Sequence, residues 1–363
     1  SASLVGSEMC IRDSRKIMSA KTNLIKIGWD IGGAHIKYCV ESRESDVIWY
    51  DIIDFDFWRD YAKLSDLIIS ICKEYHQEGS SLVNYFTMSA EMCDCFDNRR
   101  AGVKYILNQI HKIKYSSYIF SKHGLIKFDS KHKIPQDTVG SYNWYASALY
   151  VSKFINDAIL IDFGSTTCDF SIIKNGKIQN RRTSDIDGMF TKELLYTGCS
   201  RTPIYAHINE IMFRNKIYSI IPESFSSMSD INIILGNLSK GDIYSKSADG
   251  SSHSLLQSYK RVSRSFGFDY DRSKRNLIYS LCLKIYDIQF KLIDKTLSFH
   301  SEKYFKHSNF VVVGLGLGSK IIRNMCNKNR YDYLDIRDIL NSTIVNGDYL
   351  SNLFPAFVLN RLS

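Results

Sequence analysis

The feature that most constrains the fold of this chain is an acidic, glycine-containing turn between two runs of β-forming residues. Residues 158–163 and 168–173 are rich in β-branched and aromatic side chains, and Asn175-Gly176 predicts a tight turn after them. The turn itself reads Asp162-Phe-Gly-Ser-Thr-Thr167. We interpret it as a site for an oxygen-rich anion. Glycine lets the backbone approach closely, hydroxyl and amide groups donate hydrogen bonds, and a carboxylate can hold a neutralising cation.

The same arrangement occurs once earlier in the chain. Asp30-Ile-Gly-Gly33 again separates two β-rich runs, and a further glycine-rich turn, Gly314-Leu-Gly-Leu-Gly318, follows three valines. Two acidic hairpins and a late glycine-rich turn, in this order, resemble the actin-like ATPase superfamily of sugar kinases, Hsp70 and actin. The resemblance implies an α/β fold with two ribonuclease-H-like domains around a central cleft, which bind a phosphate chain and a metal between them.

The order of expected elements sets the domain boundaries. Three strands, a helix, a strand and a second helix predict an N-terminal ribonuclease-H-like domain over residues 18–156, and the second hairpin opens a C-terminal one over residues 157–363. Residues 1–17 contain Glu8-Met-Cys-Ile-Arg-Asp-Ser14, which reads like a translated sequencing adapter. We therefore treat residues 1–17 as a non-native leader and expect Met18 to be the start.

Several local elements are also expected. Tyr118–Phe128 predicts one strand, and Thr191–Leu195 predicts a short helix. Asp97 and Ser141 are expected to cap the helices that follow them, because short polar side chains accept hydrogen bonds from the first free N–H groups of a helix.

Composition excludes several classes of protein. The chain is 44% hydrophobic, which favours a globular domain, and it contains no run of about 18 apolar residues that would predict a membrane span. Its net charge of +9 comes from scattered basic residues, so we favour a solvated surface over a nucleic-acid site. There is no Cys-x-x-Cys pair, which argues against a zinc ribbon or a thioredoxin motif. We expect a cytoplasmic protein with no nucleic-acid or membrane partner, and leave homo-oligomerisation open.

Five collinear blocks make the resemblance more specific. They are Thr87-Met-Ser-Ala-Glu-Met-Cys-Asp94 with Arg100-Ala-Gly-Val103, Ser141-Tyr-Asn-Trp-Tyr-Ala146, Asp162-Phe-Gly-Ser-Thr-Thr-Cys-Asp169, Glu193-Leu-Leu-Tyr-Thr-Gly-Cys-Ser-Arg-Thr-Pro203 and Ser247-Ala-Asp-Gly250. Together they resemble the hydantoinase/oxoprolinase-related family of tetrahydromethanopterin-linked one-carbon metabolism, whose best-understood members are methanofuran-biosynthesis synthases. One departure is Ala34-His-Ile-Lys37, where the family usually has Ala-Asn-Thr-Lys.

The resemblance implies a transferase. It would form an aryl ether between an aminomethyl-furanmethyl diphosphate and a γ-glutamyltyramine-type phenol, and release diphosphate. Mg²⁺ is the implied cofactor. Two alternatives stay open: an ATP-dependent kinase or hydantoinase/oxoprolinase-type hydrolase, and a non-catalytic ATP-binding protein. We do not favour ATP as the ligand, although Gly314–Gly318 is where adenosine would lie in the superfamily.

The same resemblance, read together with the chemistry of the side chains, assigns the expected site. Asp30 and Asp162 are the metal ligands. Glu91 or Asp94 is the base, or else a helix-capping carboxylate, and Arg201 binds a substrate carboxylate or phosphate, unless it forms only a surface ion pair. The diphosphate contacts are expected from Gly32, Gly33, His35, Lys37, Gly164, Ser165, Thr166, Thr167, Gly314 and Gly316. The substrate pocket is expected from Ser89, Asn143, Trp144 and Asp169, although a turn, a helix cap or the core would also explain them.

Overall fold

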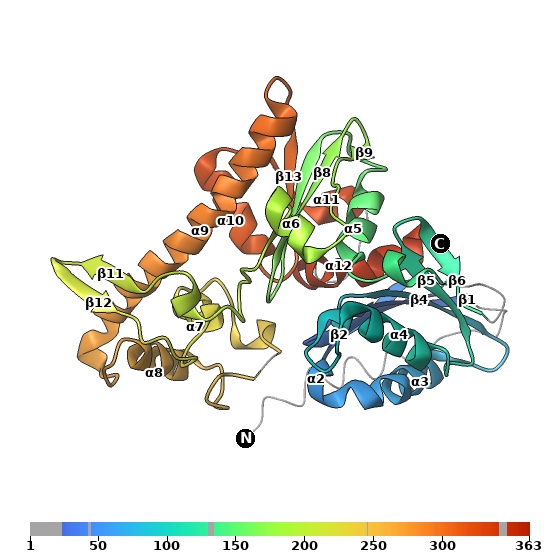
Figure 1. Ribbon diagram of the computed structural model, residues 1–363, viewed down its shortest axis with the longest axis horizontal. Helices are drawn as coiled ribbons and strands as arrows, with labels where there is room; N and C mark the ends of the chain where they lie inside the picture. Colours follow the sequence, from blue (N-terminus) through green and yellow to red (C-terminus); the bar gives the residue numbers. More distant parts are fainter. Residues whose placement is uncertain (1–23, 43–44, 130–133, 245, 341–346) are drawn as a thin grey trace.

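The structure is a computed structural model that describes residues 24–42, 45–129, 134–244, 246–340 and 347–363. It contains two mixed sheets that carry helices, with a further helical unit beside the second sheet (Figure 1). The α/β fold class predicted from the sequence is confirmed. Residues 1–17 and Met18 lie outside the described residues.

The first sheet has the strand order β3-β2-β1-β4-β5-β6. Strand β1 pairs antiparallel with β2 and parallel with β4, so an antiparallel hairpin is extended by a parallel strand. The strands are β1 (Leu24–Ile31), β2 (His35–Ser42), β3 (Ser45–Asp54), β4 (Ser81–Met88), β5 (Ser116–Ser121) and β6 (Gly124–Lys127). The helices of this half are α2 (Phe57–Asp60), α3 (Leu64–Tyr75) and α4 (Arg99–Ile110).

The second sheet repeats this plan. Its order is β10-β8-β7-β13-β14, with β7 antiparallel to β8 and parallel to β13, so β7 and β8 correspond to β1 and β2. The strands are β7 (Ala158–Phe163), β8 (Cys168–Lys174), β9 (Lys177–Ile178), β10 (Leu194–Leu195), β13 (Val311–Leu315) and β14 (Tyr333–Leu334). The helices α6 (Asp185–Thr191), α10 (Ser319–Asn329) and α11 (Ile336–Leu340) belong to this half.

A separate helical unit is inserted between β10 and β13. It is built from the hairpin β11 (Glu210–Phe213) and β12 (Lys216–Ser219) with α7 (Met228–Ile234), α8 (Leu255–Ser265) and the long α9 (Arg275–Phe305). The unit has its own hydrophobic cluster, which includes Ile211, Met228, Val262 and Leu281. In Figure 1 the β11–β12 hairpin forms the far left tip of the molecule.

Two helices join the halves. The C-terminal helix α12 (Gly347–Leu362) packs on β1, β2 and β4 of the first sheet, and also on α5 (Asn143–Val151), which packs against β8 of the second sheet. Gly28 on β1 lets α12 come close, because a Cβ atom there would lie 1.9 Å from the carbonyl oxygen of Ala356. One hydrophobic cluster therefore runs from the first sheet through α5 and α12 to the second, with Cys39, Phe120, Leu160, Val313, Phe354 and Phe357 among its members.

Pro355 in the middle of α12 makes a second connection possible. Proline has no N–H, so the carbonyl of the residue four positions earlier loses its partner within the helix. That residue is Ser351, and its oxygen accepts the N–H of Gly316 at 2.9 Å instead. The next carbonyl, that of Asn352, accepts Nζ of Lys37 at 2.8 Å. Two successive carbonyls of α12 thus bind the glycine-rich turn and the first acidic hairpin.

Some local predictions were wrong. Tyr118–Phe128 forms two strands, β5 and β6, because Gly124 adopts φ +103° and turns the chain back. The helix predicted over Thr191–Leu195 is not formed. Helix α6 ends at Thr191, and Leu194–Leu195 form strand β10, which pairs with β8. The residue that caps α4 is Asn98, not Asp97, because the Asn98 side chain accepts the N–H of Ala101. Within the described part of the chain, no helix combines the length and the apolar character that a bilayer span requires.

Candidate functional site

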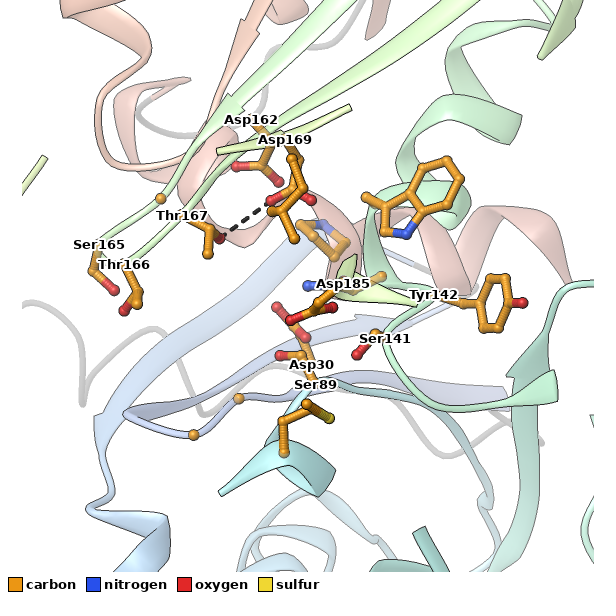
Figure 2. Close-up of a pocket in the computed structure, with 18 of the residues that line it drawn as sticks. Asp30, Ser89, Ser141, Tyr142, Asp162, Ser165, Thr166, Thr167, Asp169 and Asp185 are labelled. Carbon is orange, nitrogen blue, oxygen red and sulfur yellow. Dashed lines mark hydrogen bonds between the residues drawn. The ribbon is translucent and has the colours of Figure 1, made fainter. Parts of the chain in front are cut away.

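The two acidic hairpins meet at a pocket of about 290 Å³ between the halves of the molecule. Figure 2 shows Asp30 of the first half facing Asp162 and Asp169 of the second. Most of the residues predicted for the site line this pocket: Asp30, Gly32, Gly33, His35, Lys37, Ser89, Asn143, Trp144, Asp162, Gly164, Ser165, Thr166, Thr167, Asp169 and Arg201. Residues far apart in the chain are therefore brought together as the sequence suggested.

The two turns have the same backbone geometry. In the first, the N–H of Gly32 donates to the carbonyl of His35 at 3.0 Å; in the second, the N–H of Gly164 donates to Thr167 at 2.9 Å. Asp30 lies opposite Lys37 across its hairpin, and Asp162 lies opposite Asp169 in the same way. The resemblance between the two sequence motifs therefore reflects a true structural repeat.

The carboxyl groups of both hairpins lie in surroundings that disfavour charge. Burial raises the pKa of Asp30, and the nearby Lys37 opposes that rise. Burial raises the pKa of Asp162 to about 7, and the negative charges of Asp169 and Asp30 add to the effect. Within the described part of the chain, one carboxylate oxygen of Asp30, Oδ1, is buried and has no hydrogen-bond partner. A buried carboxyl group without a partner is a costly arrangement that a bound cation would relieve.

The first hairpin also places a histidine and a lysine at the pocket. Burial, together with Lys37 and Arg201, lowers the pKa of His35 to about 3, so the imidazole is neutral near pH 7. Its Nε2 atom is buried and has no hydrogen-bond partner. A neutral imidazole can still donate one hydrogen bond, so His35 in place of asparagine keeps a donor in the pocket.

Arg201 is positioned by the second turn. Its N–H donates to the carbonyl of Ser165 at 2.9 Å, and the N–H of Cys199 donates to Gly164 at 3.0 Å. A Cβ atom at Gly198 would lie 2.0 Å from the oxygen of Ser165, so only glycine allows this close approach of the two loops. The guanidinium of Arg201 consequently lines the pocket beside the Gly164–Thr167 turn.

The opposite end of the pocket is aromatic and was only partly predicted. The guanidinium carbon of Arg182 lies 4.1 Å from the ring centroid of Trp144, and Arg182 also forms an ion pair with Asp169. Tyr196 lines the same end and donates its hydroxyl proton to Asp185. Arg182, Asp185 and Tyr196 carried no recognisable sequence signal, apart from the place of Tyr196 in a family block. Their role depends on contacts with residues distant in the chain.

Four predicted residues lie outside the pocket. Asp94 is exposed and does not line it, so we do not propose it as a base. Gly314 and Gly316 also lie behind the pocket wall: a Cβ atom at Gly316 would come within 2.4 Å of Oδ1 of Asp162. They support the strand end that carries Asp162. Glu91 is fully buried and contacts two side chains that do line the pocket, Ser141 and Arg99.

The block Ser247-Ala-Asp-Gly250 has a structural role. Asp249 forms an ion pair with the fully buried Arg261 at 3.2 Å, and Arg261 is also paired with the buried Asp230 at 2.7 Å. These contacts hold the loop before α8 against α7. Asp249 does not line the pocket.

Among the residues that the structure describes, no group of three or more His, Cys, Asp or Glu side chains is arranged to hold a metal ion. A magnesium site completed by a substrate remains compatible with Asp30 and Asp162, since Mg²⁺ often takes one or two carboxylates, waters and substrate phosphates.

Comparison with known proteins adds independent information. Residues 83–340 match the family model described as hydantoinase/oxoprolinase. The chain is 29% identical over 340 residues to the (4-{4-[2-(gamma-L-glutamylamino)ethyl]phenoxymethyl}furan-2-yl)methanamine synthase of Methanocaldococcus jannaschii, covering 93% of this chain and 96% of that protein. It is also 29% identical over 194 residues to the synthase of the same name from Methanococcus vannielii, covering 53% and 86%.

A solved structure is similar in fold. The nucleotide-free structure of acetone carboxylase has a TM-score of 0.55 and 10% identity to this chain, covering 92% of this chain and 69% of that one. At this identity the likeness concerns the fold alone.

Proposed function

Because the chain belongs to the hydantoinase/oxoprolinase family, we propose that it is a transferase that couples an aminomethyl-furanmethyl diphosphate to a γ-glutamyltyramine-type phenol and releases diphosphate. The product would be the aryl ether named in the two synthase relatives, a step of methanofuran-type cofactor biosynthesis. The single observation that carries the proposal is the composition of the pocket. One end has two glycine turns with hydroxyl groups and cations, and the other has aromatic walls.

The glycine-turn end suits the diphosphate. Backbone N–H groups and the hydroxyls of Ser165 and Thr166 can donate to phosphate oxygens, and Lys37 and Arg201 supply positive charge. The hydroxyl of Thr167 instead donates to Oδ2 of Asp169 at 3.2 Å (Figure 2). Mg²⁺ would be held by Asp30 and Asp162, where it would neutralise charge on the diphosphate. The buried, unpartnered oxygen of Asp30 fits such an ion.

The aromatic end suits the ring substrates. Tyr196, which is 54% exposed, offers a flat surface for a furan or a phenol, and Asn143 adds a polar group. Trp144, covered by Arg182, and Tyr142 are largely buried and complete the wall. A furan ring stabilises positive charge on its attached CH₂ group, so the bond to the diphosphate can break early. The protein then needs mainly to stabilise the departing anion and to hold the phenol oxygen in line with that carbon.

The structure gives less support to ATP as the ligand. In the region of the glycine-rich turn and Leu317, the cavities measure only about 40 Å³ and 20 Å³. Ligand pockets for molecules of drug size are typically several hundred Å³. The ring of Phe163 also occupies the space beside Gly318, where a Cβ atom would lie 2.3 Å from it. An ATP-dependent kinase or hydrolase therefore remains the less favoured alternative.

The test is a direct assay. Purified protein and Mg²⁺ are incubated with the furanmethyl diphosphate and a tyramine-type phenol, and separately with ATP and the same phenol. Mass spectrometry detects the ether, and coupled assays detect diphosphate, ADP and phosphate. Asp162→Asn should abolish ether formation, whereas Asp157→Asn, at a carboxylate outside the pocket, should not. Phenol-dependent ADP formation without any ether would refute the transferase and favour the kinase.

A further inference from the structure

Ser141 has an unusual backbone at the edge of the pocket. Its φ is 54°, in the left-handed region that serine rarely adopts, and its N–H donates to the carbonyl of Met88 at 2.9 Å. The sequence predicted a helix cap here, but the cap residue of α5 is Tyr142 and no side chain caps it. A serine in this region costs free energy, which the surrounding contacts must offset.

The hydroxyl of Ser141 is engaged behind the pocket. Its Oγ donates to Oε1 of Glu91 at 2.5 Å, while Ser141 itself lines the pocket (Figure 2). A serine hydroxyl that donates one hydrogen bond can still accept another. Its free lone pairs are therefore available to an O–H group of a bound molecule.

Glu91 is built into the wall with close neighbours. Its side chain is fully buried, and Oε1 lies 3.4 Å from Nε of Arg99. A Cβ atom at Gly140 would lie 2.6 Å from Oε1, and one at Gly102 would lie 2.2 Å from the Glu91 carbonyl oxygen. The second carboxylate oxygen, Oε2, is buried and has no hydrogen-bond partner among the residues that the structure describes. A buried carboxyl group surrounded by glycines and left half-unsatisfied is expensive to maintain for packing alone.

We propose that Ser141 and Glu91 form a proton relay that deprotonates the phenol; this inference rests on the function proposed above. The phenol proton passes to Oγ of Ser141 as the proton of Ser141 passes to Oε1 of Glu91. The phenol oxygen forms the new bond to the furanmethyl carbon, and the bond from that carbon to the diphosphate oxygen breaks with its electron pair. Diphosphate leaves, and Glu91 holds the proton.

The other carboxylates of the pocket have other partners. Asp30 and Asp162 face the proposed metal position, Asp169 is paired with Arg182, and Asp185 accepts the hydroxyl of Tyr196.

The surroundings of Glu91 also suit a base. Burial raises its pKa to about 6, while Ser141 and Arg99 oppose the rise and Asp185 adds to it. A base with a pKa just below neutral pH is ionised there and still accepts a proton readily.

The relay predicts a dependence on the acidity of the phenol. Ser141→Gly removes the hydroxyl and suits φ 54°, and Glu91→Gln removes the base. Each should lower kcat roughly 100-fold or more for a tyramine-type phenol, with little change in KM for the diphosphate. For a ring-fluorinated acceptor, which is partly ionised at the assay pH, the loss relative to wild type should fall to about tenfold or less.

The matched control is Asn175→Gly, which also replaces a left-handed residue, at φ 52°, in a turn outside the pocket. It should keep wild-type kcat with both acceptors. Equal losses of kcat with both phenols, or no loss of kcat in Ser141→Gly, would overturn the relay. The proposed function would still stand if the wild type forms the ether. Absence of ether from the wild type would overturn both. If Glu91→Gln fails to fold, Ser141→Gly alone decides the question.

Discussion

Metal binding in the pocket should weaken as the pH falls, because the carboxyl groups of the acidic hairpins resist ionisation. Burial, with Asp169 and Asp30 nearby, raises the pKa of Asp162 to about 7. A metal ion needs the ionised carboxylate, so protons compete with it below that pH. For one group of pKa 7 the apparent Kd scales with 1 + 10^(7−pH). The apparent Kd should therefore rise about tenfold between pH 8 and pH 6, or about 1.4 kcal/mol.

The raised pKa of Asp30 acts in the same direction, so tenfold is a lower bound. Mn²⁺ is a suitable probe because it prefers the same oxygen ligands, and electron paramagnetic resonance measures its free concentration directly. Titrations at pH 6, 7 and 8 give the apparent Kd, and Asp157→Asn serves as the control, since it changes a carboxylate outside the pocket. A Kd that is constant within twofold from pH 6 to pH 8 would refute the reasoning.

Four further predictions follow from particular contacts. Asp30→Asn and Asp162→Asn should each leave the fold intact but abolish Mg²⁺-dependent diphosphate binding, as calorimetry would show; wild-type affinity in both would exclude the two-hairpin site. Gly28→Ala should destabilise the protein by about 1–3 kcal/mol in urea unfolding, because the new Cβ meets α12; an unchanged midpoint would contradict that packing. Arg261→Ala should cost about 3–5 kcal/mol, since it leaves the buried Asp230 unpaired; a loss below about 1 kcal/mol in the same unfolding assay would count against it. In a pH–rate profile at saturating Mg²⁺, kcat/KM should fall below about pH 6 as Glu91 becomes protonated; a flat profile from pH 5 to pH 8 would argue against Glu91 as the base.

The sequence by itself determined the two acidic hairpins and the fold class. Asp30 and Asp162 were identifiable because each hairpin is formed by residues close together in the chain. Two runs of β-forming residues flank a glycine-containing turn, and a backbone hydrogen bond closes that turn between residues three positions apart. Burial then follows from the hydrophobic pattern of the strands. Ser165, Thr166 and Thr167, predicted as diphosphate contacts, line the pocket for the same reason, since they belong to the turn itself.

The tertiary structure alone decided which side chains complete the pocket. Arg182, Asp185 and Ser141 owe their positions to packing between distant segments, and the pocket excludes Asp94 although its sequence neighbour Cys93 lines it. Lys37 is held by the carbonyl of Asn352, a residue 315 positions away on α12. Sequence patterns report the hydrogen bonds and burial of near neighbours. Contacts such as these depend on how whole elements pack, which short patterns do not encode.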